Sequence, residues 1–496
     1  MKQTRQLFSH RTMVLLSICT GLLAATDVSL GQAAERFPDF GFLPGPADYA
    51  GKVFKLSQKY PASGASVGDL PNFFRLDFQR EPREYLLAVR DYCFRDNIGH
   101  PDIENDFRLE EAMADVSKPP RWYHMPWQHW GALGREGIHG LTKEAPVGKW
   151  ALAKNQQTTG QTYAVAFYNE AAATAIGKVW ARFIPDPSIT SVPGGGFPEG
   201  SVIFKLLFIT NPVAEISFLG KEEDCVQWKG YVTDAFSPLT VESPRHIQKL
   251  TLVQMDIMVK DARAPFKWVF GTYQYNAQAN AAIKWNRLVP VGLMWGNDPQ
   301  NRDSDPHSVA GKTALKENMA VLKDTPWNEK LTGTYINHAD ADLPPTHLGW
   351  NGRLNGPVDN PMSSCMSCHQ TAQYPSASVL GPTFLTGPGE TVPPQGSDAW
   401  MLWFRDLPCG EPFDKSGTAS TDGSLQLSMS ILNFYSWFKT QQGGVVTNTY
   451  RQQQATAHPA ASAESVPAPG SPAISAPKAP VENREILRDD GSGGPR

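Results

Sequence analysis

Short apolar runs dominate the middle of the chain and predict β-strands. They are rich in Val, Ile, Phe and Tyr, and Gly, Pro, Asn and Asp clusters separate them. The runs are Ser201–Thr210, Cys225–Thr233, Lys249–Lys260 and Phe266–Tyr275, and Val289–Trp295 is a further candidate. In Lys249–Lys260, apolar and polar positions alternate only in part, which predicts a strand covered on both faces. Together the runs predict an antiparallel sheet.

Other segments place apolar residues at helical spacing. These are Glu84–Arg95, the Ala-rich segment Thr162–Arg182, and Leu425–Lys439, with a shorter helix expected at Thr313–Leu322. Three residues are candidate caps for the helix at Leu425–Lys439: Thr421, Asp422 and Ser424. By contrast, three prolines interrupt Pro119–Trp130, so this segment is expected to be a loop. The predicted fold class is therefore α+β.

The first residues have the pattern of a secretory signal. Lys2, Arg5 and Arg11 precede an apolar run at Met13–Ala25 that is too short to span a bilayer. Small residues follow, and cleavage is expected near Ala33 or Ala34. A lipid anchor at Cys19 is disfavoured, because the bulky Ile18 precedes it. The expected mature protein is periplasmic and has no membrane span.

Composition agrees with a globular protein, since 41% of the residues are hydrophobic and 19% are charged. The net charge of -4 argues against nucleic acid as a partner, because phosphate binding needs a basic excess.

One motif carries specific chemistry: Cys365-Met366-Ser367-Cys368-His369. Two thiols at this spacing can add across the vinyl groups of a porphyrin, and the following His can bind the iron. Because haem c is attached outside the cytoplasm, the signal segment strengthens this interpretation. The motif predicts one covalent haem c, with Cys365 and Cys368 attached and His369 as the proximal iron ligand.

Two alternatives to haem are a structural zinc site and a redox dithiol. Zinc needs a second pair of ligands, whereas Cys409 stands alone. A thioredoxin-like dithiol follows a strand and starts a helix, whereas Pro and Ser precede this motif. Outside the motif, Cys93, Cys225 and Cys409 allow one disulfide or none in the exported chain.

The distal side of the haem decides its role, and several side chains compete for it. Met401 and Met429 follow the motif, where small c-type cytochromes place their axial Met. The loop Tyr123–Trp130 contains His124, Met125 and His129 among aromatic residues, so it is a candidate haem or substrate pocket. Further candidates for proton transfer, charge stabilisation or packing on the haem are Arg121, Arg135, Glu136, His139, His338 and His347.

The chain resembles two kinds of haem protein. The segments Arg135–Glu144 and Asn355–His369 resemble large exported single-haem c-type cytochromes. The segments Phe167–Glu170 and Phe197–Lys205, with Met258–Asp261 and the motif, are similar to the cytochrome c′-beta family and its hydroxylamine-oxidising relatives. This resemblance implies a haem held against an antiparallel sheet. Some relatives cross-link a Lys to the haem, and Lys205 lies in the matching segment.

The expected organisation has five parts. They are a signal peptide (1–34), a helix and loop region (35–160), a β-rich domain (161–300), a haem-binding segment (301–450) and a disordered Ala/Pro/Ser-rich tail (451–496). Electron transfer to a redox partner protein is the first expected function. The alternatives are a haem enzyme or sensor for peroxide, nitric oxide or hydroxylamine, and a haem subunit of a larger redox complex.

Overall fold

The computed structural model describes residues 43–51, 53, 58–61, 69–95, 97–98, 122–128, 135–233, 244–296, 333–337, 348–375, 381, 391–413 and 418–441. Three expected segments lie outside these residues: the signal segment 1–34, the helix at Thr313–Leu322 and the tail 451–496.

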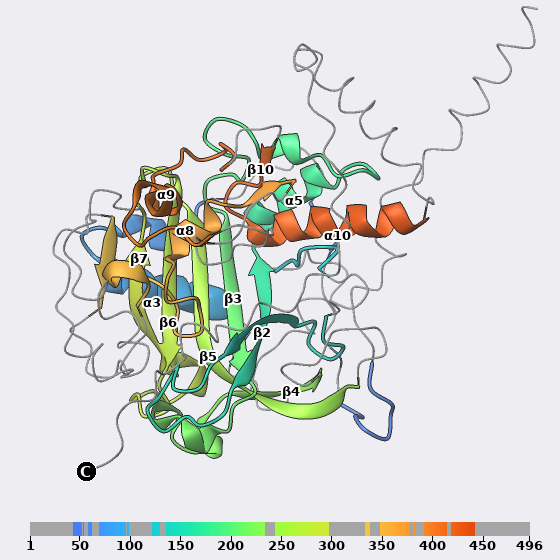
Figure 1. The fold of residues 1–496 in the computed structure, drawn as a ribbon, viewed down its shortest axis with the longest axis vertical. Helices are drawn as coiled ribbons and strands as arrows, with labels where there is room; N and C mark the ends of the chain where they lie inside the picture. The colour runs from blue at the N-terminus through green and yellow to red at the C-terminus, as the bar shows by residue number, and fades with distance from the viewer. Residues whose placement is uncertain are drawn as a thin grey trace, which may run out of the picture.

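An eight-stranded antiparallel sheet forms the centre of the molecule (Figure 1). Its strands are β1 (Thr142–Val147), β2 (Gly160–Tyr168), β3 (Val202–Ile209), β4 (Gln227–Val232), β5 (His246–Lys260), β6 (Trp268–Tyr275), β7 (Leu288–Met294) and β8 (Thr334–Ile336). The order is β1-β2-β3-β5-β6-β7-β8, and β4 pairs with β5. The predicted antiparallel sheet and its five predicted strands, which correspond to β3–β7, are confirmed. The sheet also takes in β1 and β8, which lie outside the range 161–300.

Five α-helices and several 3-10 turns surround the sheet in the described part of the chain. The helices are α3 (Pro82–Phe94), α5 (Glu170–Val179), α8 (Cys365–His369), α9 (Asp398–Met401) and α10 (Leu425–Gln441). The turns are η1 (Asn72–Arg75), η4 (Pro187–Ile189), η5 (Val213–Glu215), η6 (Ser217–Leu219), η7 (Glu222–Asp224), η8 (Lys284–Arg287), η9 (Trp350–Gly352) and η10 (Leu402–Phe404). Two short strands, β9 (Gln373–Tyr374) and β10 (Ala419–Ser420), pair separately. The helices predicted at Glu84–Arg95 and Leu425–Lys439 are confirmed as α3 and α10, and Ser424 accepts the Leu427 N–H as the cap of α10.

The helix predicted over Thr162–Arg182 is wrong in its first half. Residues Gly160–Tyr168 form β2, which is buried at every position. A strand covered on both faces has no polar alternation, so its Ala-rich sequence imitates a buried helix. The helix α5 starts only after Asn169, whose Oδ1 accepts the N–H groups of Ala172 and Val202.

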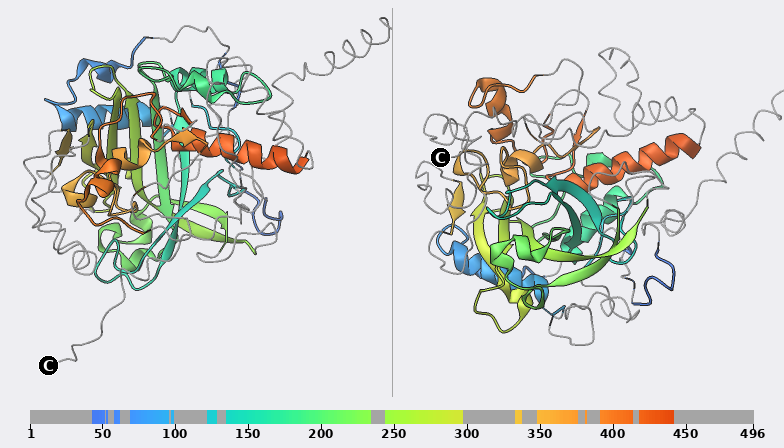
Figure 2. Two further views of the ribbon diagram at one scale, coloured as in Figure 1. Left: turned by 45° about the horizontal axis from the view of Figure 1, so that its top comes forward. Right: turned by 60° about the horizontal axis from the view of Figure 1, so that its bottom comes forward.

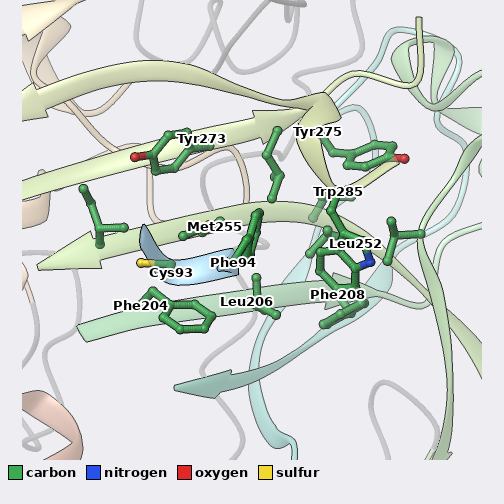
Figure 3. Packing of buried hydrophobic residues seen from close by; sticks show 14 of the residues in the cluster. Cys93, Phe94, Phe204, Leu206, Phe208, Leu252, Met255, Tyr273, Tyr275 and Trp285 are labelled. Atoms are coloured by element: carbon green, nitrogen blue, oxygen red, sulfur yellow. The ribbon is translucent and has the colours of Figure 1, made fainter. Parts of the chain in front are cut away.

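The helix α3 covers one face of the sheet. Cys93 and Phe94 of α3 pack against Phe204 and Met255 from β3 and β5 (Figure 3). The Tyr273 hydroxyl donates to the Leu86 carbonyl at 2.6 Å, which ties the helix to β6. Each fully buried apolar side chain of this size contributes about 1.5–3 kcal/mol. This face is therefore a large, mainly apolar core.

The opposite face carries α8 and the start of α10. Figures 1 and 2 show these segments across the sheet from α3. Met366 of α8 packs with Met258 and Phe270 of the sheet, while Leu427 and Ile431 of α10 belong to the same apolar cluster. The polar motif therefore lies on a different face from the main core. Among the described residues, no helix has both the length and the apolar character needed to cross a membrane.

Candidate functional site

The segment Cys365–His369 forms α8, a short helix closed at its start by two serines. Ser364 Oγ accepts the Ser367 N–H at 3.1 Å, and Ser367 Oγ accepts the Ser364 N–H at 2.7 Å. This capping box satisfies two amide groups that the helix itself cannot pair. Residues three apart on a helix are surface neighbours, so Cys365 and Cys368 lie on one side of the turn.

The imidazole of His369 is fixed by one backbone hydrogen bond. Its Nδ1 lies 2.8 Å from the Gly423 carbonyl oxygen, and its ring centroid lies 5.0 Å from that of Phe270. Because a carbonyl oxygen only accepts, Nδ1 carries the proton and Nε2 keeps its lone pair. Burial lowers the pKa of His369, so the imidazole is held neutral. A neutral imidazole oriented in this way has the form of a metal ligand.

The Gly423 carbonyl is presented by a turn before α10. Asp422 has a φ of 50° and Gly423 a φ of 78°, so two successive residues adopt the left-handed region. The buried Asp422 carboxylate is held by Lys260 Nζ at 2.8 Å and by Trp268 Nε1 at 3.1 Å. These contacts stabilise a conformation that a non-glycine residue rarely adopts. The position of the acceptor for His369 therefore depends on β5 and β6.

The two motif thiols are free of disulfides, as are Cys93, Cys225 and Cys409. Burial raises the pKa of Cys368 to about 11, and it also raises the pKa of Cys365 well above its usual value. A redox dithiol needs the opposite shift. Within the described ranges, no group of three or more His, Cys, Asp or Glu side chains could hold a metal ion. The dithiol and zinc alternatives therefore gain no support.

Polar side chains lie on the α8 face of the sheet, where an apolar core would otherwise continue. Lys205 of β3 pairs in register with Asp256 of β5, which pairs with Thr272 of β6. Thr272 donates to Asp256 Oδ1 at 2.7 Å. The Gln254 amide nitrogen lies 2.8 Å from each Asp256 oxygen and 2.9 Å from Asp359 Oδ2. Because side chains alternate along a strand, the strand residues of this cluster share one face.

Carboxyl groups outnumber cations in this cluster. Lys205 Nζ lies 3.1 Å from Glu144 Oε1, while Asp256 and Asp359 share the neutral Gln254 amide. Burial, followed by the charge of Asp359, raises the pKa of Asp256 to about 7. The charges of Lys205 and Asp359 also act on the pKa of His369, which Lys205 lowers and Asp359 raises. Asp256 is therefore suited to exchange a proton near neutral pH beside the motif.

Replacing Asp256 with Asn is expected to change stability in a pH-dependent way. The folded pKa of about 7 lies above the unfolded value of about 4, so the folded protein binds the proton more tightly. Wild-type stability should therefore fall as the pH rises from about 4 to about 7. Asn imitates the protonated acid and does not titrate. The free energy of unfolding of the variant should therefore exceed that of the wild type by on the order of 1–3 kcal/mol at pH 8. Urea unfolding at pH 5 and pH 8 measures this difference.

The exposed Glu223 provides the control for this comparison, because its side chain is 72% exposed. Glu223→Gln should change stability by a similar small amount at both pH values. An equal effect of Asp256→Asn at pH 5 and pH 8 would contradict the assigned titration.

A buried cation and two indole groups adjoin α8. Arg353 is fully buried, and its guanidinium carbon lies 4.8 Å from the ring centroid of Trp350. The Cys365 N–H of α8 donates to the carbonyl of Leu354, and Leu354 directly follows Arg353 in the chain. Among the described atoms, the buried Nε1 groups of Trp350 and Trp400 have no hydrogen-bond acceptor. This donor set suits the carboxylates of a bound ligand.

The structure places His124 on the other side of β2. Its Nδ1 lies 2.9 Å from the Ala166 carbonyl oxygen, and its ring contacts Phe167, which stacks on Phe204 of the α3 face. Burial lowers the pKa of His124 to about 3, so it is a poor base. His124 is therefore directed away from the polar cluster, and this position does not favour a distal role.

Four further candidates, from this loop and the segment after it, are divided between two environments. Met125 and Arg135 line a small cavity on the α8 side of β2, next to Ala166. Glu136 instead accepts backbone N–H groups, and His139 stacks on Trp228 in the main core. Met125 and Arg135 therefore lie on the same side of the sheet as the motif, whereas Glu136 and His139 do not.

The two Met candidates differ in burial. Met401 is buried in an aromatic cluster with Trp350 and Trp400. Met429 is 40% exposed on α10. The exposed position of Met429 does not favour a role as an iron ligand. The remaining candidates, Arg121, His129, His338 and His347, lie outside the described residues.

Comparison of the chain with protein-family models, curated proteins and solved structures finds no match. The site therefore rests on its own geometry.

The sequence analysis did not single out Asp256, Asp359, Gly423 or Lys260 as site residues. One signal was present, because Gln254 and Asp256 are polar residues at successive same-face positions in the apolar half of β5.

Proposed function

We propose that this chain is an exported c-type cytochrome with one haem attached to Cys365 and Cys368 and with His369 as an axial ligand. The hydrogen bond between His369 Nδ1 and the Gly423 carbonyl carries the proposal, because it fixes the tautomer and leaves Nε2 free for iron. The N-terminal signal pattern supports a periplasmic location.

The residues around α8 fit a haem in three respects. The two thiols are free, the His is neutral and oriented, and a buried cation suits the propionates, together with two indole N–H groups that have no acceptor among the described atoms. A bound haem would supply one-electron redox chemistry or a coordination site for a small molecule. This chain's residues would attach the group, orient its axial ligand and exclude water.

Haem staining tests this proposal. Protein produced with the cytochrome c maturation machinery should keep a haem-stained band after denaturing electrophoresis, because thioether bonds survive denaturation. A band without stain would overturn the proposal.

Electron transfer with a redox partner protein is the simplest role for a single haem. The polar cluster supports a second candidate, which is a reaction or sensing event with peroxide, nitric oxide or hydroxylamine. A simple carrier has no need of a buried acid whose pKa is raised to about 7, whereas turnover of such molecules needs proton transfer. The cluster of Lys205, Asp256 and Asp359 therefore favours the second role.

Optical spectra in the presence of gases separate the two roles. A role in small-molecule chemistry predicts a high-spin or weakly ligated haem whose reduced spectrum changes on adding carbon monoxide or nitric oxide. A low-spin six-coordinate spectrum that neither gas alters would instead establish the electron carrier. Met429→Ala should leave the spectrum unchanged, since the Met429 side chain is 40% exposed.

A further inference from the structure

A second reactive cluster lies at the end of β5, apart from the motif. Lys260 Nζ lies 2.8 Å from Cys409 Sγ and 2.8 Å from Asp422 Oδ2. The Cys409 thiol in turn donates to Asp422 Oδ1 at 2.7 Å. Sulfur is larger than oxygen, so these distances mean that nitrogen and sulfur are in close contact. The amine of Lys260 is thus held directly against a thiol.

The three groups differ in their access to solvent. The side chains of Lys260 and Asp422 are 5% and 0% exposed. Cys409 is partly exposed in a turn that follows the exposed Pro408. Cys409 is therefore the most solvent-exposed member of this cluster, and the buried amine of Lys260 lies in contact with its sulfur.

Other cysteines in the described part of the chain lack this arrangement. Cys93 is fully buried in the main core, and Cys225 is buried with its thiol 3.0 Å from the Leu219 carbonyl oxygen. Only Cys409 combines partial exposure with a lysine amine in direct contact, among the cysteines that the structure describes. The contact between its thiol and a lysine amine therefore sets Cys409 apart from Cys93 and Cys225.

We propose that Cys409 and Lys260 form a reversible covalent sulfur–nitrogen link when the protein meets peroxide. The thiol attacks one peroxide oxygen, which gives a sulfenic acid and one water. The Lys260 amine then attacks the sulfenic sulfur, the S–N bond forms, and hydroxide leaves as water. In total, one thiol, one ammonium and one H2O2 give the link, two waters and one proton. Sulfur loses two electrons and peroxide gains them.

Asp422 is placed to accept a proton from the Cys409 thiol and a proton from the Lys260 ammonium. Its Oδ1 already accepts the thiol hydrogen, and its carboxylate also contacts Lys260 Nζ. Burial raises the pKa of Cys409 to about 12, so the thiol is protonated at neutral pH and the reaction should be faster in alkali.

The link would act on the turn that orients His369, a consequence that rests on the proposed haem function. Linking removes the positive charge of Lys260 and leaves the Asp422 carboxylate with the neutral donors Trp268 and Phe197. Asp422 directly precedes Gly423, whose carbonyl holds His369. Oxidation should therefore shift the haem spectrum, whereas the link itself can be measured without haem.

Mass spectrometry of the full-length protein tests the proposal. After peroxide treatment and alkylation, digestion should give a joined peptide pair containing Lys260 and Cys409 with a mass two hydrogens below the sum of the two peptides. Dithiothreitol should separate the pair. A joined pair with one additional oxygen would mean that the bridge is not the proposed sulfur–nitrogen bond, and it would overturn the proposal.

Matched variants assign the link to these two side chains. Cys409→Ser and Lys260→Arg should each abolish the joined peptide, while Cys225→Ser should retain it. Because the wild-type chain provides the main measurement, poor folding of a variant does not remove the test. Cys409 that stays reduced or is oxidised to sulfinic or sulfonic acid without joining Lys260 would overturn the proposal. This result is distinct from a missing haem-stained band, which concerns the motif alone.

Discussion

Replacing Cys365 and Cys368 together with Ser is expected to abolish covalent haem attachment. The two thiols lie on one side of α8 and are free of disulfides, so they are the only groups of the motif able to form thioether bonds. The haem-stained band should fall to background in the double variant. Total protein, measured on the same gel, should remain detectable.

Met366→Leu is the matched control, since it changes a buried residue of the same turn and keeps both thiols and His369. A volume-conserving swap of this kind costs less than about 1.5 kcal/mol, so the stained band should persist. Retention of stain by the double Ser variant would show that haem is attached elsewhere or not through this motif.

Replacing Lys260 with Met is expected to destabilise the protein by about 3–5 kcal/mol, because it leaves a buried carboxylate without its cation. The Lys260 and Asp422 side chains are 5% and 0% exposed, and their atoms lie 2.8 Å apart. The remaining donors to the Asp422 carboxylate are Trp268 Nε1, the Phe197 N–H and the Cys409 thiol, and all three are neutral. Urea unfolding at pH 7 measures the loss.

A surface ion pair provides the control. Lys249 and Glu222 lie 2.5 Å apart but are 58% and 59% exposed, so Lys249→Met should cost less than about 1 kcal/mol. Adding Asp422→Asn to Lys260→Met should recover part of the loss, because it removes the unpaired charge. Equal effects of the Lys260 and Lys249 substitutions would contradict the assigned burial.

Most of the sheet could be predicted from sequence, because five strands appear as separate Val-, Ile- and Phe-rich runs. The edge strands β1 and β8 could not. Thr142–Val147 contains Lys, Glu and Pro, and Thr334–Ile336 is only three residues long. Such segments become strands through pairing with β2 and β7, not through their own pattern.

The motif could likewise be found from sequence, whereas its surroundings could not. Asp256 and Asp359 are far apart in the chain, and Gly423 follows His369 by many residues. Asp256 and Asp359 meet at the Gln254 amide, and the pairing of β9 with β10 brings the turn at Gly423 close to His369. The pairing of Tyr123 with Tyr168 of β2 instead sets His124 against Phe167 and away from the polar cluster. Residue types in the Tyr123–Trp130 loop could not show this, because they do not reveal which strand the loop contacts.

The sequence by itself determined the local chemistry of this protein: two thiols and a His within five residues, the pattern of an export signal and an antiparallel sheet. These features depend on spacing and composition, which a single segment contains. The tertiary structure alone decided which groups act on that His. It placed the Gly423 carbonyl on Nδ1, brought Asp256 and Asp359 to one amide, and buried Lys260 against Cys409 and Asp422. Hydrogen bonds and charges act over a few ångströms in space, and residues distant in sequence meet at such distances only when the chain folds.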